Sequence, residues 1–264
     1  MDVHTPRTLE EALRLKAQLP EARFVQGGTD LMVELNFGRS RPDALVNLAE
    51  LAELKGWSRE NGDLRLGAGL TYTEAMRPEL AELAPALAEA SRTVGSPQIR
   101  NRGTIGGNLG TASPAGDALP PLLVERARVD LASVRGVRTL PLAEFLLGVK
   151  RNALEPDELV TSVRLRPSGG LQTFMKVGPR NAMVIAICSL AVVVDPEVGE
   201  VRAAFGSAAT TAKSVTVPLA DAGSLPERVA DAASPIDDVR ATAAYRRHAL
   251  RVLAGRAVER CLRL

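Results

Sequence analysis

Residues 25–31 read Val-Gln-Gly-Gly-Thr-Asp-Leu, and residues 103–117 read Gly-Thr-Ile-Gly-Gly-Asn-Leu-Gly-Thr-Ala-Ser-Pro-Ala-Gly-Asp. In the first stretch, Gly27 and Gly28 separate a strand-like segment from an apolar helical pattern that begins near Thr29. Glycines have no Cβ, so they let backbone amides approach a ligand closely, and neutral amide donors suit an anion. The first stretch therefore indicates a turn that could cradle a phosphate group.

The second stretch combines adjacent glycines, three small hydroxyl side chains, the Asn108 amide and the Asp117 carboxylate. We expect a long loop folded against an extended polar ligand, in which Asp117 accepts hydrogen bonds from sugar hydroxyls. Neither stretch is a GxGxxG or a Walker A motif. Two alternatives remain open: a purely steric strand-to-helix turn for the first stretch, and a loop ordered by its own side chains for the second.

The rest of the chain alternates helical and strand-like patterns. Thr8 with Glu11 three residues later predicts a capping box at the start of a helix, and Thr71 predicts a second helix start. We expect strands at residues 23–26, 46–48, 64–69, 129–131 and 159–163, and a helix at residues 80–93. This order is typical of a mixed α and β fold.

Residues 167–170, Pro-Ser-Gly-Gly, form the best candidate for a domain boundary, because a new strand-rich pattern follows these turn residues. We expect antiparallel strands at residues 174–177, 185–194 and 201–205, with a hairpin turn at residues 195–200. An amphipathic helix from about Val239 would close the chain.

Charge and composition exclude several functions. The chain has 33 Lys and Arg against 31 Asp and Glu, so its net charge of +2 supplies no basic field for nucleic acid. The two cysteines, Cys188 and Cys261, exclude a disulfide framework, a CxxC zinc site and a four-cysteine iron–sulfur cluster. His4 and His248 are the only histidines, and neither has a carboxylate or cysteine at ligand spacing, so we expect no metal site.

The sequence shows no sign of membrane insertion or secretion. Its first residues have neither a basic nor an apolar leader segment, so we expect a cytoplasmic location. The longest apolar run, residues 182–194, is shorter than the roughly 20 residues of a membrane span, and we interpret it as a buried strand.

Three motifs, residues 26–31, 99–108 and 112–117, occur in the order of the flavin-binding motifs of molybdenum hydroxylase FAD subunits. The chain resembles this family, which includes the carbon monoxide dehydrogenase medium subunit and the xanthine dehydrogenase FAD domain, over nearly its whole length. The resemblance implies an α+β fold with a two-lobed FAD-binding region of the vanillyl-alcohol-oxidase (PCMH) type over residues 1–167. Its lobes would cover about residues 1–54 and 55–167, and a smaller α+β domain would cover residues 168–264.

The resemblance also implies that FAD lies between the two lobes. Residues 26–31 and 104–108 would hold the diphosphate, Asp117 would bond sugar or ribityl hydroxyls, Val160 would pack near the flavin and Lys176 would lie near the isoalloxazine edge. The full set of implied cofactor-binding residues is Gln26, Gly27, Gly28, Thr29, Asp30, Leu31, Thr104, Ile105, Gly106, Gly107, Asn108, Thr111, Ser113, Asp117, Val160 and Lys176.

Two positions depart from the family pattern. Val184 stands where the family often has an aspartate, in the segment that follows Arg180, so a contact made by that acid is missing. Val94 stands where xanthine dehydrogenase places an aromatic residue over the flavin ring, and aromatic residues make up only 3% of the chain.

The function that the resemblance implies is electron relay without substrate hydroxylation in this chain. A molybdenum-cofactor large subunit would oxidise the substrate, and a small subunit with [2Fe-2S] clusters would pass electrons singly to FAD and on to an external acceptor, in a dimer of heterotrimers. The alternatives are a stand-alone FAD oxidoreductase, for which we find no base beside the flavin, and a non-catalytic nucleotide-binding assembly module. The substrate and the choice among NAD, quinone and oxygen stay open.

Overall fold

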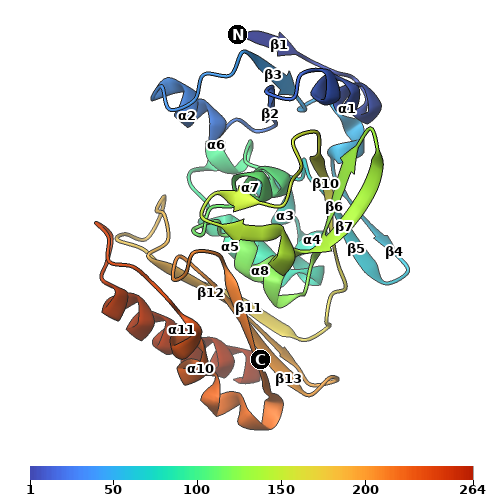
Figure 1. Cartoon of the computed structure of the whole chain (residues 1–264). Helices are drawn as coiled ribbons and strands as arrows, with labels where there is room; N and C mark the ends of the chain where they lie inside the picture. Colours follow the sequence, from blue (N-terminus) through green and yellow to red (C-terminus); the bar gives the residue numbers. More distant parts are fainter. Residues whose placement is uncertain (264) are drawn as a thin grey trace.

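The computed structural model describes residues 1–263, in which three main sheets follow one another along the chain (Figure 1). The first sheet is parallel, with the order β1-β3-β2. Parallel strands need crossover connections, and two helices supply them. The elements of this N-terminal lobe, residues 1–54, are β1 (Asp2–His4), α1 (Leu9–Gln18), β2 (Arg23–Val25), α2 (Leu31–Asn36), β3 (Ala44–Asn47) and η1 (Ala52–Leu54).

The central sheet is antiparallel, with the order β4-β5-β10-β6-β7. Its strands are β4 (Trp57–Glu60), β5 (Asp63–Gly67), β6 (Arg128–Ser133), β7 (Gly136–Pro141) and β10 (Leu159–Leu165), and β8 (Leu146–Gly148) pairs separately with β9 (Arg151–Asn152). The helices of this region are α3 (Tyr72–Ala75), α4 (Pro78–Leu83), α5 (Pro85–Thr93), α6 (Pro97–Arg100), α7 (Ile105–Thr111), α8 (Leu119–Val124) and α9 (Leu142–Phe145).

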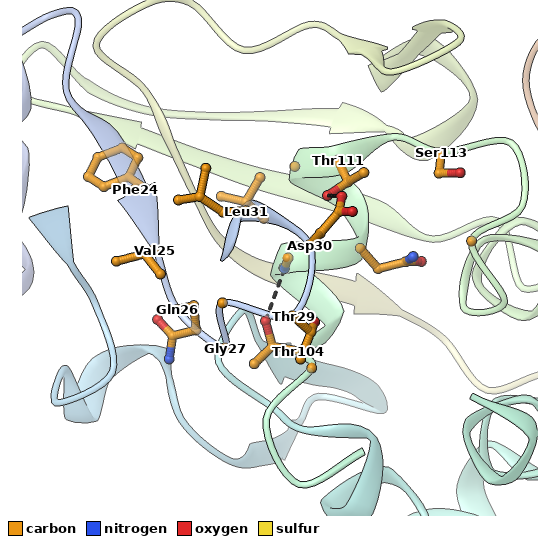
Figure 2. Close-up of a pocket in the computed structure, with 18 of the residues that line it drawn as sticks. Phe24, Val25, Gln26, Gly27, Thr29, Asp30, Leu31, Thr104, Thr111 and Ser113 are labelled. Atoms are coloured by element: carbon orange, nitrogen blue, oxygen red, sulfur yellow. Dashed lines mark hydrogen bonds between the residues drawn. The ribbon is translucent and has the colours of Figure 1, made fainter. Parts of the chain in front are cut away.

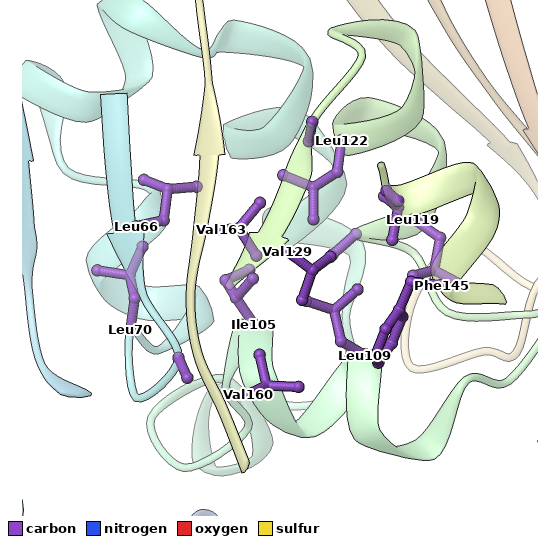
Figure 3. Packing of buried hydrophobic residues seen from close by; sticks show 14 of the residues in the cluster. Leu66, Leu70, Ile105, Leu109, Leu119, Leu122, Val129, Phe145, Val160 and Val163 are labelled. Atoms are coloured by element: carbon purple, nitrogen blue, oxygen red, sulfur yellow. The ribbon is translucent and has the colours of Figure 1, made fainter. Parts of the chain in front are cut away.

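Helix α7 is fixed against the central sheet by its apolar side. Ile105 and Leu109 are fully buried, and Figure 3 shows them among Val129 of β6 and Val160 and Val163 of β10. The other side of α7 carries only small residues, because its sequence alternates these two apolar residues with glycine, asparagine and threonine. The helix can therefore be anchored in the core and still present a small-residue surface to a ligand.

The third sheet is antiparallel, with the order β11-β12-β13-β14, and it lies at the bottom of Figure 1. Strand β12 is buried along its whole length, and its side chains alternate between two hydrophobic clusters. One face of the sheet packs on α5 and α8, and the other packs on α10 and α11. The elements are β11 (Leu171–Val177), β12 (Cys188–Asp195), β13 (Glu200–Gly206), β14 (Lys213–Pro218), η2 (Leu219–Ser224), α10 (Leu225–Ala232) and α11 (Ala243–Arg263).

These elements confirm the α+β class. The apolar run at residues 182–194 forms a buried strand only from Cys188 onwards, because Met183 and Ile185 are exposed and lie outside the strand. None of the helices in residues 1–263 is long and apolar enough to cross a membrane. The segment between β10 and β11 joins the central and third sheets at the proposed boundary, residues 167–170. The division of the chain into domains at this segment stays a prediction.

Four local predictions were wrong. Residues 80–93 form two helices, because Pro85 starts a new helix after the non-helical Ala84. Residues 103–116 are not a continuous loop but contain α7, which Thr104 caps by accepting from the Gly107 amide. The terminal helix begins at Ala243 and not near Val239. At α1 the Thr8 cap is present, but the Glu11 carboxylate accepts from the Arg7 amide, so the box is incomplete.

Glu89 of α5 connects the helices around the central sheet to the third sheet and its helix α11. Its carboxylate accepts hydrogen bonds from the Thr173 hydroxyl at 2.9 Å and the Phe174 amide at 2.7 Å, and it pairs with Arg260 of α11 at 2.6 Å. We expect Glu89→Gln to lower the free energy of unfolding by about 1 to 2 kcal/mol, because bonds to a charged acceptor are stronger than bonds to an amide. Urea unfolding would measure the loss. The same change at exposed Glu82 of α4 is the control, and an equal effect at both positions would refute this role of Glu89.

Candidate cofactor site

A cavity of about 690 Å³ lies between the N-terminal lobe and the central region (Figure 2). This volume is typical of sites for small molecules and cofactors. Five segments contribute most of its wall: residues 22–31, helix α7, residues 113–117, residues 154–160 and residues 183–185. These segments come from distant parts of the sequence, so only the folded chain forms the cavity.

The structure brings most of the predicted site residues together around this cavity. The residues that line it are Gln26, Gly27, Gly28, Thr29, Asp30, Leu31, Thr104, Gly106, Gly107, Asn108, Thr111, Ser113, Asp117 and Val160. Two predicted residues do not line it. Ile105 points into the core and is fully buried, and Lys176 lies behind Asp117.

The turn after β2 carries a run of available backbone donors. Within residues 1–263, no hydrogen bond uses the backbone N–H groups of residues 27–31, and the first bond of helix α2 runs from the Met32 amide to the Gly28 carbonyl. Gly28 has a φ of +74°, which favours glycine. A Cβ on Gly27 would lie 1.8 Å from the Arg102 carbonyl oxygen, so only glycine fits there. Five consecutive free amides form a natural receptor for an anion.

The amides at the start of α7 are, in contrast, already used by the protein. The Ile105 amide donates to the Leu70 carbonyl at 2.9 Å, and the Gly106 amide donates to the Ala68 carbonyl at 2.8 Å. A Cβ on Gly106 would lie 2.6 Å from the Ala68 Cβ, so this glycine is needed for close packing. The Ile105 and Gly106 amides are therefore not available to a ligand, and their bonds place α7 beside the cavity.

Three buried acceptors around the cavity have no hydrogen-bond partner in the described chain. They are Gln26 Oε1, Asn108 Oδ1 and Asp117 Oδ1. Leaving a buried polar atom without a partner costs about 1 to 3 kcal/mol, so a ligand that supplies hydroxyl or N–H donors would be stabilised here. The cavity thus offers free donors in the turn after β2 and free acceptors from three other positions.

Asp117 and Lys176 form a buried ion pair at the cavity wall. Lys176 Nζ lies 2.6 Å from Asp117 Oδ2 and also donates to the Thr93 carbonyl at 3.2 Å. The Asp117 side chain is 8% exposed and the Lys176 side chain is 5% exposed. Burial raises the pKa of Asp117, and the Lys176 charge and hydrogen bond act in the opposite direction. Lys176 therefore holds Asp117 in place and does not face the cavity.

The positions that depart from the expected pattern, Val94 and Val184, both line the cavity. Neither can supply an aromatic ring or a carboxylate. An aromatic residue that the sequence analysis did not select, Tyr72, also lines the cavity and is 5% exposed. Burial strongly raises the pKa of Tyr72, so its hydroxyl stays protonated. Tyr72 follows the Thr71 cap, which orients the first turn of α3.

The sequence family described as the FAD binding domain in molybdopterin dehydrogenase matches residues 1–167. The chain belongs to this molybdopterin dehydrogenase FAD-binding family. It is 40% identical over 190 residues to the nicotinate dehydrogenase FAD-subunit of Eubacterium barkeri, covering 69% of this chain and 64% of that protein. It is 30% identical over 274 residues to a putative xanthine dehydrogenase FAD-binding subunit of Escherichia coli, covering 97% and 94%.

Solved structures support membership of the FAD-binding family. A chain of reconstituted CO dehydrogenase from Oligotropha carboxidovorans superimposes with a TM-score of 0.90 at 27% identity, covering 99% of this chain and 97% of that one. A chain of carbon monoxide dehydrogenase from Hydrogenophaga pseudoflava gives 0.88 at 26% identity, covering 100% and 96%. The family's cofactor is FAD. Its diphosphate needs donors and its sugar and ribityl hydroxyls need acceptors, and the cavity offers both.

Proposed function

We propose that this chain binds FAD in the cavity and acts as the flavin relay subunit of a molybdenum hydroxylase complex. The observation that carries the proposal is the combination of five free amides at residues 27–31 with three unpartnered acceptors, at Gln26, Asn108 and Asp117, around one cavity. FAD contains an anionic diphosphate between two hydroxyl-bearing chains, so it requires both kinds of partner.

Different residues would bind different parts of FAD. The amides of residues 27–31 would hold the diphosphate, and the hydroxyls of Thr29 and Ser113 add neutral donors around it, while the Thr111 hydroxyl donates to Asp30. The oxygens of Gln26, Asn108 and Asp117 would accept from cofactor hydroxyls and ring N–H groups. Apolar contact with the rings would come from lining residues such as Val94, Val160 and Val184.

Bound FAD would supply redox chemistry that links one-electron donors to a two-electron acceptor. The chain itself needs no acid, base or metal for that step, and within residues 1–263 no three His, Cys, Asp or Glu side chains gather as a metal site. We infer that electrons come from [2Fe-2S] clusters on a small subunit, after substrate oxidation on a molybdenum-cofactor large subunit. The relatives named as FAD-subunits or medium chains favour such an assembly. The dimer of heterotrimers, the external acceptor and the cytoplasmic location stay predictions.

Flavin absorbance of the purified chain, before and after incubation with FAD, tests the binding step. We expect about one FAD per chain and loss of most flavin fluorescence. A chain that stays colourless after reconstitution would refute both the relay and the stand-alone oxidoreductase and would leave the assembly module. Purification of the chain from its native source tests the relay: subunits that contain molybdenum and iron should co-purify. Recovery of a lone flavoprotein that oxidises its own substrate would instead support the stand-alone oxidoreductase.

A further inference from the structure

A cluster of three charged side chains stands at the edge of the cavity, next to the free amides. Glu34 of α2 pairs with Lys150 at 3.0 Å through one carboxylate oxygen and with Arg23 at 3.6 Å through the other. All three residues line the cavity. The cluster carries two positive charges and one negative charge, so its net charge of +1 favours an anion nearby.

Lys150 occupies a defined position opposite the N-terminal lobe. It lies in the turn between β8 and β9, where its amide donates to the Ala112 carbonyl at the end of α7 at 3.1 Å. The neighbouring Thr111 hydroxyl donates to Asp30 of the amide-bearing turn at 2.7 Å, and Figure 2 shows these two side chains together. The Lys150 side chain is 52% exposed, so its ammonium can move without breaking the packing of the turn.

The other cavity-lining cations are less able to reach a ligand anion. Lys16 donates to the Pro20 and Ala22 carbonyls, and burial lowers its pKa. Arg23 already lies beside Glu34 and can neutralise that carboxylate alone. If Lys150 moved away, Glu34 would therefore keep a cationic partner.

We propose that Lys150 is an additional anion-binding residue, which leaves Glu34 and contacts the diphosphate of the nucleotide cofactor when the cofactor binds. The inference rests on the proposed function, because the diphosphate is that of FAD. The amides of residues 27–31 are neutral, and Asp30 and Glu34 bring negative charge to the same region, so a mobile cation there offsets repulsion of the ligand. In this arrangement Glu34 pairs with Lys150 when no ligand is bound, and it competes with the ligand for the lysine.

Equilibrium titration of the purified, flavin-free full chain tests the proposal, with FAD and riboflavin as probes and flavin fluorescence as the readout. Riboflavin lacks the diphosphate. We expect Lys150→Met to weaken FAD binding about tenfold and to reduce its dependence on salt concentration, while riboflavin binding changes less than about twofold. Lys150→Arg should retain most of the FAD affinity. Lys213→Met, at an exposed position of β14, is the control for loss of a lysine and should leave both affinities unchanged.

Glu34→Gln distinguishes this proposal from the alternative that the Glu34–Lys150 ion pair only holds the two sides of the cavity together. If Glu34 competes for Lys150, the variant should bind FAD as tightly as the wild type or more tightly. If the ion pair only closes the cavity, Glu34→Gln and Lys150→Met should weaken binding alike, and that result would overturn the proposal. Unchanged FAD affinity in Lys150→Met, or an equal loss for riboflavin, would also overturn it. Failure of the wild-type chain to bind FAD at all would instead refute the proposed function.

Discussion

Gly27→Ala should strongly weaken FAD binding and should lower the thermal stability of the chain. The new methyl group would lie 1.8 Å from the Arg102 carbonyl oxygen and 2.6 Å from its carbon, so the backbone itself must move. Overpacking of this kind costs about 3 kcal/mol. Movement of the turn would also misplace the free amides of residues 27–31. We expect FAD affinity to fall about a hundredfold, as measured by fluorescence titration, together with a lower melting temperature.

Two other glycines supply matched controls, Gly223 for FAD affinity and stability and Gly110, which lines the cavity, for stability alone. A Cβ on Gly223 or on Gly110 would meet no atom within 4 Å, and neither glycine has a positive φ. Gly223 lies far from the cavity in sequence and is exposed, so Gly223→Ala should leave FAD affinity and stability nearly unchanged. Gly110→Ala should keep or slightly raise the melting temperature, because alanine favours the helix α7. Wild-type stability and affinity in Gly27→Ala would show that the turn after β2 does not need this close approach.

Lys176→Met should destabilise the folded chain by about 3 kcal/mol at neutral pH. The substitution leaves the Asp117 carboxylate buried without its cation, and breaking a buried ion pair in this way is strongly destabilising. Chemical denaturation measures the loss. Asp117→Asn combined with Lys176→Met should recover a large part of it, because no charge is then buried alone. If adding Asp117→Asn to Lys176→Met lowered the free energy of unfolding further by a similar amount, the two side chains would not act as a pair.

The pH dependence of Lys176→Met follows from the same pair. Burial raises the pKa of Asp117, and Lys176 counteracts that effect, so removing Lys176 raises the pKa further. When the pKa of a carboxyl group is higher in the folded than in the unfolded chain, the folded chain becomes less stable as pH rises through the folded pKa. The penalty of the substitution should therefore be largest at neutral pH and should shrink as Asp117 becomes protonated in acid. Denaturation at pH 7 and at about pH 5 measures this difference. A penalty that grew towards acid pH would contradict the assignment.

Local signals in the sequence predicted local structure well. The Thr8 and Thr71 caps and the apolar run of β12 each depend on neighbours within a few residues. The helix α7 was missed because its glycines and threonine are poor helix formers, and tertiary bonds to the Ala68 and Leu70 carbonyls stabilise its first turn. The break at Pro85 was missed although proline at the first helical position is a known start signal.

The sequence could predict which segments line the candidate site. It could not predict which of them keep polar groups free to bind a ligand. Both glycine stretches carried the same chemical signal, yet within residues 1–263 the turn at residues 27–31 keeps five consecutive amides without a partner, whereas the amides of Ile105, Gly106 and Gly107 are bonded within the protein. The steric alternative was stated for the first stretch, where Gly27 does need close packing on Arg102 but also keeps an amide without a partner in residues 1–263. In the second stretch, Gly106 packs on Ala68. Pairs such as Asp117 with Lys176 and Glu34 with Lys150 join residues 59 and 116 positions apart, and no local pattern reports such contacts.

The third sheet has a consequence for how the chain unfolds. One face of β12 belongs to the hydrophobic cluster of the central region, and the other face belongs to the cluster under α10 and α11. Removing this sheet would expose apolar surface on α5 and α8, which are part of the region matched by the FAD-binding family. Residues 1–167 and 168–264 therefore depend on each other for stability, and the chain should unfold in one cooperative transition, even though the cofactor cavity is built mainly by the first of them.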